Sequence, residues 1–404
     1  MYSRLLIFGR QPALSLAELH AFAEARGLSL SVRLSTSIGA VVVDGLPDAV
    51  ADTLVEQLAG VVKVAVLLGQ QPLVPLTDTA AWVQTLQPLI ADASMRTFGI
   101  SYYGTRASVP SSSVQERIAL TIKKAARSNG GRVRWVSGRG KPLTSVQVEK
   151  NQMLGAEGSE FIVLVDRSEL VIAKTTAVQL FEDWGSRDFG RPARDARSGM
   201  LPPKLARLMV NLLGLPPQGI LLDPFCGSGT ILMEAAVAGW ASVIGSDKSA
   251  KAVSDSEENM AWLKNAKGIS ADYTFFKTPV AKLVSRVSGR SVAAVVSEPD
   301  LGPALRVAPT VAEAKRIAAG LLPLYRELLM AVGKVLRPGG RAVLVVPRWV
   351  TQSGEQVPLR IPVSSLPKNV YERLPTEEHQ RDNALVYQRP DQRVIREIIS
   401  FEAR

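Results

Sequence analysis

LLDPFCGSGT, residues 221–230, is the stretch of the sequence that decides the fold. An apolar run leads into Asp223, a turn with two glycines follows, and the helix-like stretch Thr230–Ala238 comes next. Strand, tight loop and helix therefore succeed one another. Glycines in such a loop let the backbone approach a ligand closely, and the helix N-terminus offers free N–H groups. The decapeptide predicts a nucleotide-type cofactor site at the first strand of a doubly wound sheet.

The glycine loop differs from the common phosphate-binding motifs. It contains no G-x-G-x-x-G pattern, and no Lys-Ser/Thr pair follows the second glycine, so a P-loop is excluded. The alternative interpretation is an ordinary strand, turn and helix whose glycines serve the turn alone. The single cysteine, Cys226, lies inside the loop. Because no base is adjacent in the sequence, we interpret Cys226 as a small packed residue rather than a catalytic thiol.

Strand-like and helix-like segments alternate from Leu201 onward, which predicts an α/β fold with a parallel sheet and right-handed crossovers. The predicted strands are 219–222, 241–247, 273–276, 292–296, 341–346, 385–388 and 395–401. The predicted helices are 203–213, 230–238, 249–264 and 311–336, the last with Pro323 as a candidate kink. Residues 336–340, LRPGG, are predicted to form a turn before a strand.

The N-terminal half has a different pattern. Strand, helix, two strands, helix and strand are predicted over residues 4–8, 14–26, 31–43, 48–59 and 61–68. This βαββαβ order fits a small ferredoxin-like module. A linker is predicted at 71–79, followed by helices 82–89 and 113–128 and by strands 98–103, 132–136, 146–150, 161–165 and 170–175. We therefore expect α+β modules ahead of the α/β half.

The charge distribution favours a polyanionic partner. The chain has 404 residues and a net charge of +11, and eight basic residues but no acid lie between Arg117 and Val148. Trp135 and the glycines at 130, 131, 138 and 140 are interleaved with these charges, as on surfaces that bind unpaired bases. A solvated face rich in Lys and Arg is the alternative. The predicted RNA contacts are Lys123, Lys124, Arg127, Arg132, Arg134, Arg139 and Lys141.

Composition excludes several other kinds of site. One cysteine allows no intrachain disulfide, and the two histidines, His20 and His379, are far apart, so no Cys/His metal cluster is predicted. No apolar run is long enough to span a bilayer, and the N-terminus shows no signal-peptide cleavage pattern. We expect a cytoplasmic protein without a membrane partner. The sequence does not indicate an oligomeric state.

Two further polar positions follow predicted strands of the α/β half. Asp247 ends the second strand, about twenty residues after the glycine loop, where an acid can accept both ribose hydroxyls of a nucleoside. Ser297-Glu298-Pro299-Asp300 ends the fourth strand. An exocyclic amine of a base is a poor nucleophile, because its lone pair is conjugated into the ring. A side-chain oxygen and a proline-held carbonyl can accept its N–H groups and direct the lone pair at a methyl donor. An ordinary strand-to-loop turn is the alternative.

The sequence resembles a known family in several places. DPFCGSGT, residues 223–230, is similar to motif I of S-adenosylmethionine (SAM) methyltransferases that modify exocyclic amino groups. Residues 191–212, RPARDARSGMLPPKLARLMVNL, resemble the segment joining the RNA-binding and catalytic halves of THUMP-domain tRNA guanosine-N2 methyltransferases. Residues 5–10 and 16–19 resemble the ferredoxin-like entry of these enzymes, and residues 98–101 and 143–145 their THUMP module.

This resemblance implies an architecture and a set of roles. A ferredoxin-like domain (1–75), a THUMP RNA-binding domain (76–178) and a linker (179–200) would precede a Rossmann-like class I methyltransferase domain (201–404) with a seven-stranded, mostly parallel sheet. The N-terminal half would grip tRNA, and Ser297, Glu298, Pro299 and Asp300 would face the target amine. SAM would be bound by Asp223, Pro224, Phe225, Gly227, Gly229, Thr230, Asp247 and Lys204.

The sequence departs from this family at two points. The usual Asp/Asn/Ser-Pro-Pro-Tyr/Phe motif ends in an aromatic that stacks on the base, whereas this chain has Glu298 for a proline and Asp300 for the ring. A shift of one residue would align Glu298 with the leading acid instead, and Trp349 is a candidate replacement ring. Residues 276–279, FKTP, lack the acid that contacts adenine in relatives. A tRNA-binding protein with impaired catalysis and a DNA amino-methyltransferase are the alternative functions.

Overall fold

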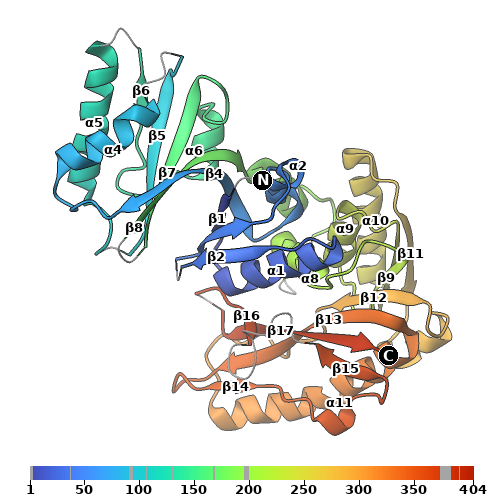
Figure 1. Ribbon diagram of the computed structural model, residues 1–404. Coiled ribbons are helices and arrows are strands. Elements are labelled where there is room, and N and C mark those ends of the chain that lie inside the picture. The colour runs from blue at the N-terminus through green and yellow to red at the C-terminus, as the bar shows by residue number, and fades with distance from the viewer. Residues whose placement is uncertain are drawn as a thin grey trace. The chain divides into compact units, whose positions relative to one another are not determined.

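The computed structural model describes residues 3–36, 38–90, 94–105, 107–128, 132–166, 169–194, 200–373, 384–390 and 392–404 (Figure 1). The chain divides into two compact units, which are described separately. The first comprises residues 1–15 and 28–183, and the second comprises residues 16–27 and 184–404. Among the described residues, none of the helices combines the length and the apolar character that crossing a bilayer requires. His379 and the glycines at 130 and 131 lie outside the described residues.

The first unit begins with the predicted βαββαβ pattern. Its strands pair antiparallel in the order β2-β3-β1-β4. The predicted helix over 48–59 is instead two short helices, and Thr53 lies at the break, where its hydroxyl donates to the Val50 carbonyl. The elements along this part of the chain are β1 (Arg4–Phe8), α1 (Pro12–Ala25), β2 (Ser31–Ser35), β3 (Ala40–Asp44), α2 (Asp48–Ala51), α3 (Leu54–Gln57) and β4 (Val61–Pro72). Helix α1 belongs to the second unit from residue 16 onward.

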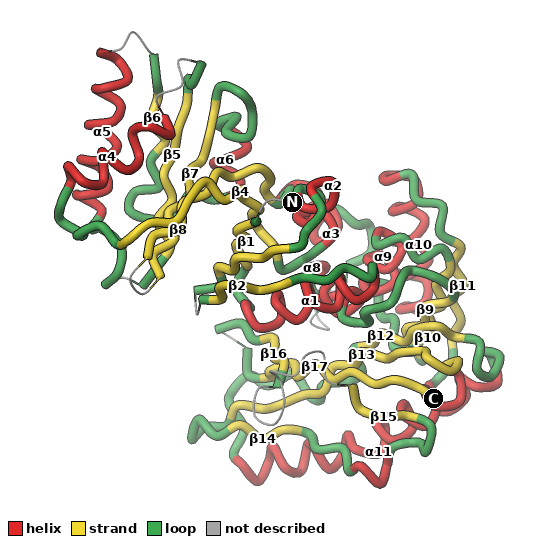
Figure 2. Tube along the Cα trace, in the orientation of Figure 1, coloured by secondary structure: helices red, strands yellow, loops and turns green. Residues whose placement is uncertain are grey.

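The same sheet continues beyond β4. Strand β4 pairs antiparallel with β8, and the order runs on as β8-β7-β5-β6, which makes one sheet of eight strands (Figure 2). Residues 1–75 and 76–178 therefore share a sheet, and the predicted boundaries between modules stay predictions. The remaining elements of this unit are α4 (Thr79–Ile90), β5 (Thr97–Tyr103), α5 (Ser112–Ser128), β6 (Arg134–Val136), α6 (Ser145–Lys150), β7 (Gly158–Asp166) and β8 (Glu169–Val178).

One predicted strand of this unit is wrong. Residues 146–150 belong to helix α6, although their alternating apolar side chains suggested a strand. The reason is a capping box: the Thr144 hydroxyl accepts from the Gln147 backbone N–H, and the Gln147 side chain accepts from the Thr144 N–H. Helices α4 and α5 pack on the sheet through a core that includes Trp82, Phe98 and Ile118.

The second unit contains the predicted Rossmann-like sheet. Its main path is β11-β10-β9-β12-β13-β17-β15, in which the first five strands are parallel and β17 is antiparallel to both neighbours. This confirms a seven-stranded, mostly parallel sheet, to which β14 and β16 add short antiparallel pairs. The strands are β9 (Ile220–Asp223), β10 (Ser242–Asp247), β11 (Asp272–Lys277), β12 (Val292–Ser297), β13 (Leu336–Val350), β14 (Gln356–Pro358), β15 (Val370–Arg373), β16 (Leu385–Tyr387) and β17 (Val394–Ala403).

The central strand β12 is buried along its whole length, as expected for a parallel strand covered on both faces. The LRPGG segment, predicted as a turn, lies within β13 as an irregular stretch, because Leu336 pairs with Val292 while Arg341 already pairs with Ala294. The helices are α7 (Phe181–Phe189), α8 (Pro203–Asn211), α9 (Thr230–Val237), α10 (Ala250–Lys267) and α11 (Val311–Val335), with 3₁₀ turns at Val280–Ser285 and Val363–Ser365.

Candidate cofactor and substrate site

The candidate site lies where the order of strands reverses. Strand β9 has β10 on one side and β12 on the other, so the chain runs outward from β9 through β10 to β11 and then crosses back to β12 on the opposite side of β9. Ligands of open α/β sheets bind outside the carboxyl ends of strands at such a point. Asp223, Asp247 and Ser297 are the last residues of β9, β10 and β12. Three of the predicted site residues therefore lie along one edge of one sheet.

The glycine loop bridges the ends of β9 and β10. The Gly227 N–H donates to Asp247 Oδ2 at 3.2 Å, and the Cys226 N–H donates to the Ser246 carbonyl at 3.0 Å. Gly227 and Gly229 have φ values of 51° and 82°, a region that L-residues enter at a cost, and Gly229 is the N-cap of α9. A Cβ added at Gly227 would meet no atom within 4 Å, so the loop backbone there faces open space.

Asp247 fits the predicted role at the ribose. Its Oδ1 accepts from the Ser249 N–H at 2.8 Å, and its Oδ2 accepts from the loop. Each carboxylate oxygen has a further lone pair, so both remain able to accept a hydroxyl hydrogen. The two backbone contacts hold the carboxylate in place beside the glycine loop. The Asp247 carboxylate is thus oriented for a ligand before any ligand binds.

Two residues of α10 support the loop and were not predicted. The Ser256 hydroxyl donates to the Gly227 carbonyl at 2.8 Å. The Asn259 side-chain amide donates to the carbonyls of Ser228 and Ala193, both at 2.8 Å, and accepts from the Ala193 N–H at 2.9 Å. Asn259 therefore ties the segment before the domain to the glycine loop. The available sequence signal was two polar residues, three apart, within the buried stripe of a helix.

A buried cluster of charges surrounds the start of α9. Arg191 donates to the Thr230 hydroxyl at 2.6 Å, so the predicted cofactor residue Thr230 is engaged within the protein. The Glu234 carboxylate forms ion pairs with Arg187 at 2.5 Å and with Arg207 at 3.2 Å, and all three side chains are buried. These contacts fix the N-terminal turns of α9 against the preceding helices. They place the helix end beside the loop with little freedom to move.

Lys204 lies beside the Trp184 ring of α7. Its side chain is exposed, and its ammonium lies 5.6 Å from the centre of the Trp184 ring. Arg187 also lies over Trp184, at 4.5 Å. The structure thus associates Lys204 with α7, and its predicted contact with a cofactor stays a prediction. Pro224, Phe225 and Gly227 follow β9 directly, and the Phe225 N–H donates to Asp223 Oδ1 at 3.0 Å.

Asp223 is a buried acid at the centre of the site. Only 1% of its surface is exposed, and its Oδ1 accepts from the Ser297 hydroxyl at 2.6 Å. Burial raises the pKa of this carboxyl from 3.8 to about 7, although the hydrogen bonds from Ser297 and Phe225 act in the opposite direction. Burial also raises the pKa of the Cys226 thiol well above its ordinary value. The thiol is therefore neutral near pH 7, which fits a packed residue.

The tetrapeptide after β12 is held by two distant residues. Arg396 of β17 binds both carboxylate oxygens of Glu298, at 2.6 and 3.3 Å. The Tyr325 hydroxyl of α11 donates to the Asp300 carbonyl at 3.1 Å. Ser297 and Pro299 are buried, Glu298 is 14% exposed at its side chain, and Asp300 is exposed. One predicted register places Ser297 at the amine and the other places Glu298 there. The oxygen atoms of Glu298 are the more accessible of the two.

The candidate replacement ring does not reach the surface. Trp349 is fully buried and packs in a core cluster with Tyr325 and Val346. At the end of β11 the side chain of Lys277 is exposed, while the Thr278 N–H donates to the Asp247 carbonyl. No acid occupies residues 276–279, as the sequence indicated.

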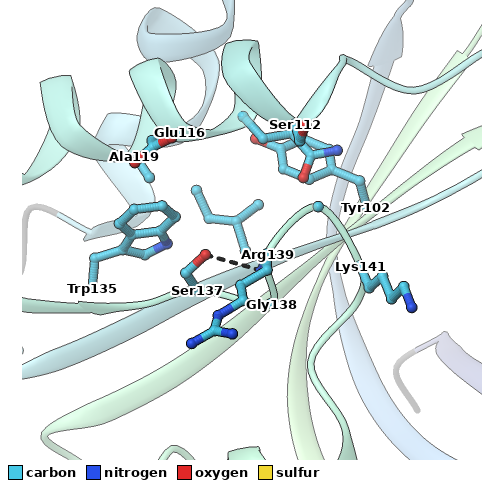
Figure 3. A pocket seen from close by; sticks show the side chains of 12 residues that line it. Tyr102, Ser112, Glu116, Ala119, Trp135, Ser137, Gly138, Arg139 and Lys141 are labelled. Carbon is cyan, nitrogen blue, oxygen red and sulfur yellow. Dashed lines mark hydrogen bonds between the residues drawn. The ribbon is translucent and has the colours of Figure 1, made fainter.

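The predicted RNA contacts all belong to the first unit, and six of the seven are exposed while Lys123 is half-buried. They divide into two groups. Lys123, Lys124 and Arg127 lie on the C-terminal half of α5, and Arg132 and Arg134 follow in the sequence. Arg139 and Lys141 lie instead near the first turns of α5, in a loop after β6 (Figure 3). The helix thus has basic side chains near both of its ends.

Comparison with known proteins shows what the second unit is similar to. Residues 191–351 match the family UPF0020, described as an RMKL-like methyltransferase domain. These residues, less than half of the chain, are therefore similar to a methyltransferase domain. A tRNA (guanine(10)-N2)-dimethyltransferase of Methanothermobacter thermautotrophicus is 33% identical over 152 residues, which are 38% of this chain and 40% of the relative. Its namesake in Methanocaldococcus jannaschii is 53% identical over 49 residues, 12% of this chain and 14% of the relative. Each match spans less than half of the relative's length.

Solved structures extend the likeness in fold beyond residues 191–351. The crystal structure of TrmN from Thermus thermophilus has a TM-score of 0.58 at 19% identity, and the match covers 100% of both chains. SMU.472, a putative methyltransferase complexed with SAH, has a TM-score of 0.51 at 13% identity and covers 100% of this chain and 99% of its own. Both show that the whole chain, and not only its second unit, shares their fold.

Proposed function

We propose that the protein transfers a methyl group from SAM to the exocyclic N2 amine of a guanosine in tRNA, in the cytoplasm. The observation that carries this proposal is the alignment of Asp223, Asp247 and the 297–300 tetrapeptide along one edge of the sheet at the switch point. The printed activity of the two curated relatives supports the choice of guanine and tRNA. The first unit, with its exposed basic residues, would bind the tRNA.

The residues present fit SAM. Open space beside Gly227 admits the amino acid end of the cofactor next to the loop backbone, and the fixed carboxylate of Asp247 would accept its ribose hydroxyls. Pro224, Phe225, Gly229 and Thr230 shape the same loop. When bound, SAM supplies a methyl group on a positively charged sulfonium. The ionised form of Asp223, although buried, would then have an opposite charge nearby.

The residues that would face the target base would act by positioning its amine. The target amine needs acceptors for its N–H groups, so that its lone pair points at the methyl carbon. Arg396 fixes the Glu298 carboxylate in one orientation, and each Glu298 oxygen retains a lone pair that an amine hydrogen could reach. Tyr325 fixes the backbone at Asp300. Glu298 is thus the residue we assign to the amine, with Ser297 acting through Asp223.

A second candidate function has three observations in its favour. The Ser297 hydroxyl is fully buried and committed to Asp223, Glu298 is neutralised by Arg396, and the exposed Asp300 replaces a stacking ring. Stacking on an aromatic contributes about 1–3 kcal/mol per base. A protein of this fold that binds tRNA and SAM without transferring the methyl group would have these properties.

One experiment separates the candidates. The full chain is incubated with tritium-labelled SAM and either unmodified tRNA or duplex DNA, and SAM affinity is measured by calorimetry. The proposal predicts label in tRNA alone, recovered as a guanosine methylated at N2 by nucleoside mass spectrometry. SAM binding without transfer would favour the second candidate, and transfer to DNA alone would favour an amino-methyltransferase acting on DNA. Glu298→Ala should abolish transfer while SAM still binds.

A further inference from the structure

The candidate site lacks a stacking ring at the position where the usual motif has one. Asp300 takes that position, and Trp349 is buried in the core. An acceptor for the amine fixes one edge of a base, but it leaves the plane of the base free to turn. A ring stacked on the base fixes that plane. The question is therefore which other element brings a ring to this end of the sheet.

Strands β13 and β17 continue past the end of β12. Ser297, the last residue of β12, pairs with Leu344, whereas Pro347, three residues further along β13, pairs with Arg396 of β17. Arg396 therefore lies beyond the carboxyl end of β12, and its guanidinium binds Glu298 there. This part of the sheet is the one next to the position proposed for the target amine.

Strand β16 adds a tyrosine at the same place. Tyr387, the last residue of β16, lies directly opposite Arg396 in the antiparallel register of β16 and β17 (Figure 1). Directly opposite residues point to the same face of a sheet, with their Cβ atoms about 4.5–5.5 Å apart. The Tyr387 side chain therefore lies beside the arginine that holds Glu298. Tyr387 is half-buried, so part of its surface is accessible to a ligand.

The turn between β16 and β17 holds the ring in place. Arg389 Nε donates to the Tyr387 hydroxyl at 2.9 Å, and the guanidinium carbon is 5.8 Å from the ring centre. Arg389 thus holds the ring at its hydroxyl rather than lying flat against one of its faces. The Gln392 N–H donates to the Arg389 carbonyl at 3.0 Å, and the Gln392 side chain accepts from Arg396 at 3.3 Å. Tyr387 is therefore connected through this turn to the ion pair at Glu298.

A second tyrosine of the same sheet provides a comparison. Tyr371 of β15 also pairs with β17, and it is 43% exposed. It lies opposite Glu402, which in turn lies opposite Arg341, near the start of β13. Tyr371 is therefore at the other end of β17, away from Glu298. The position along β17 distinguishes the two tyrosines, and only Tyr387 adjoins the residues assigned to the amine.

We propose that Tyr387 stacks on the target base, in place of the ring that the tetrapeptide lacks. Glu298 accepts from the exocyclic amine, and the Tyr387 ring beside Arg396 fixes the plane of the base. Arg389 and Arg393, both exposed, suit the phosphates on either side of that base. This inference rests on the proposed function, because it names a residue that positions the base for methyl transfer.

The first test is methyl transfer from tritium-labelled SAM to unmodified tRNA by the full chain. Tyr387→Ala and Tyr387→Leu each remove the ring and should lower kcat/KM roughly 5- to 150-fold. Tyr387→Phe keeps the ring and should retain most of the transfer. Tyr371→Ala is the matched control and should transfer like the unsubstituted chain. Thermal melting of each variant shows whether it is folded, and Tyr387→Leu serves if the alanine variant is not.

A second readout does not need transfer. The full chain, with S-adenosylhomocysteine, is titrated into a single-stranded RNA pentamer that has 2-aminopurine at its centre and uridylates on both sides. This fluorescent base has the same exocyclic amine as guanine, and stacking on an aromatic ring quenches it. The quenching should persist in Tyr387→Phe and in Tyr371→Ala, and it should decrease in Tyr387→Leu.

The two readouts separate this inference from the proposed function. Transfer and quenching by Tyr387→Leu that equal those of the unsubstituted chain would overturn the role of Tyr387 and leave the function standing. Quenching that depends on Tyr387, in a chain that transfers no methyl group, would refute only the proposed function. Lost transfer with unchanged quenching, or equal losses in Tyr387→Phe and Tyr387→Leu, would show that Tyr387 acts through its hydroxyl contact with Arg389 and not by stacking. A chain with neither transfer nor such quenching would refute both.

Discussion

Asp223 is the residue through which pH should act on the second unit. Its pKa is raised by burial from 3.8 to about 7, so the folded protein holds a proton that the unfolded chain releases between these values. The stabilisation is complete below about pH 4 and is lost as the pH rises through 7. The free energy of unfolding should therefore fall by up to roughly 4 kcal/mol across this window on account of this group.

Asp223→Asn isolates that effect. The amide keeps the shape of the carboxyl and the acceptor for Ser297 but cannot ionise. Urea unfolding of both proteins at pH 4, 5.5, 7 and 8 gives the difference in stability, in which the titration of His20 and His379 cancels. We expect the stability of the variant, relative to that of the unsubstituted protein, to increase as the pH rises. A difference that does not vary with pH would show that Asp223 is already ionised at pH 4.

The ion pair between Glu298 and Arg396 should be coupled strongly. Their side chains are 14% and 7% exposed, so removing one partner leaves a largely buried charge alone. Such a loss costs about 3 kcal/mol, and removing both partners costs less. Glu298→Gln, Arg396→Met and the double variant form a cycle, measured by urea unfolding at pH 7. Additive effects of the two single changes would contradict the pairing.

At the scale of elements, the two loop glycines should separate binding from stability. Both have positive φ, so alanine costs about 1–2 kcal/mol at either position. At Gly229 the new Cβ would also lie 3.1 Å from the Ser256 hydroxyl, whereas at Gly227 it would point into open space. We expect Gly227→Ala to lose SAM affinity with a modest fall in melting temperature, and Gly229→Ala to lose more stability. Calorimetry with SAM and thermal melting check both expectations. Unchanged SAM affinity in Gly227→Ala would show that the cofactor does not bind at this loop.

Elements with a local cause were predictable from the sequence, and contacts between distant segments were not. The strand before Asp223, the glycine loop and the acid at the end of β10 follow from spacing along a single βαβ unit. Asn259 and Arg396 reach the site from a helix face and an antiparallel strand, and Arg396 is 98 positions from its partner. Helix α6 was mistaken for a strand because apolar alternation over five residues outweighed a capping box at Thr144. The buried position of Trp349 depends on packing that no periodicity reveals.

At the scale of the whole molecule, the net charge of +11 should govern tRNA binding. Each phosphate neutralised by Lys or Arg releases counterions, so affinity should fall steeply with salt. Replacing Lys124 and Arg127 by Gln should weaken tRNA binding at every salt concentration. It should also reduce the slope of log K against log salt by about 2. Filter binding between 50 and 300 mM salt measures the slope. Lys315→Gln, an exposed lysine on α11, is the matched control.

The continuous sheet of the first unit also sets an order of events in time. Strand β4 pairs with β1 on one edge and with β8 on the other, and β8 is synthesised about a hundred residues later. While the ribosome is still making that stretch, β4 presents an open edge that other chains could pair with. Closing so long a loop is slow, because its entropy is lost before the new contacts form. The late arrival of Glu169–Val178 should therefore limit the rate of folding, and refolding should be most prone to aggregation just before it.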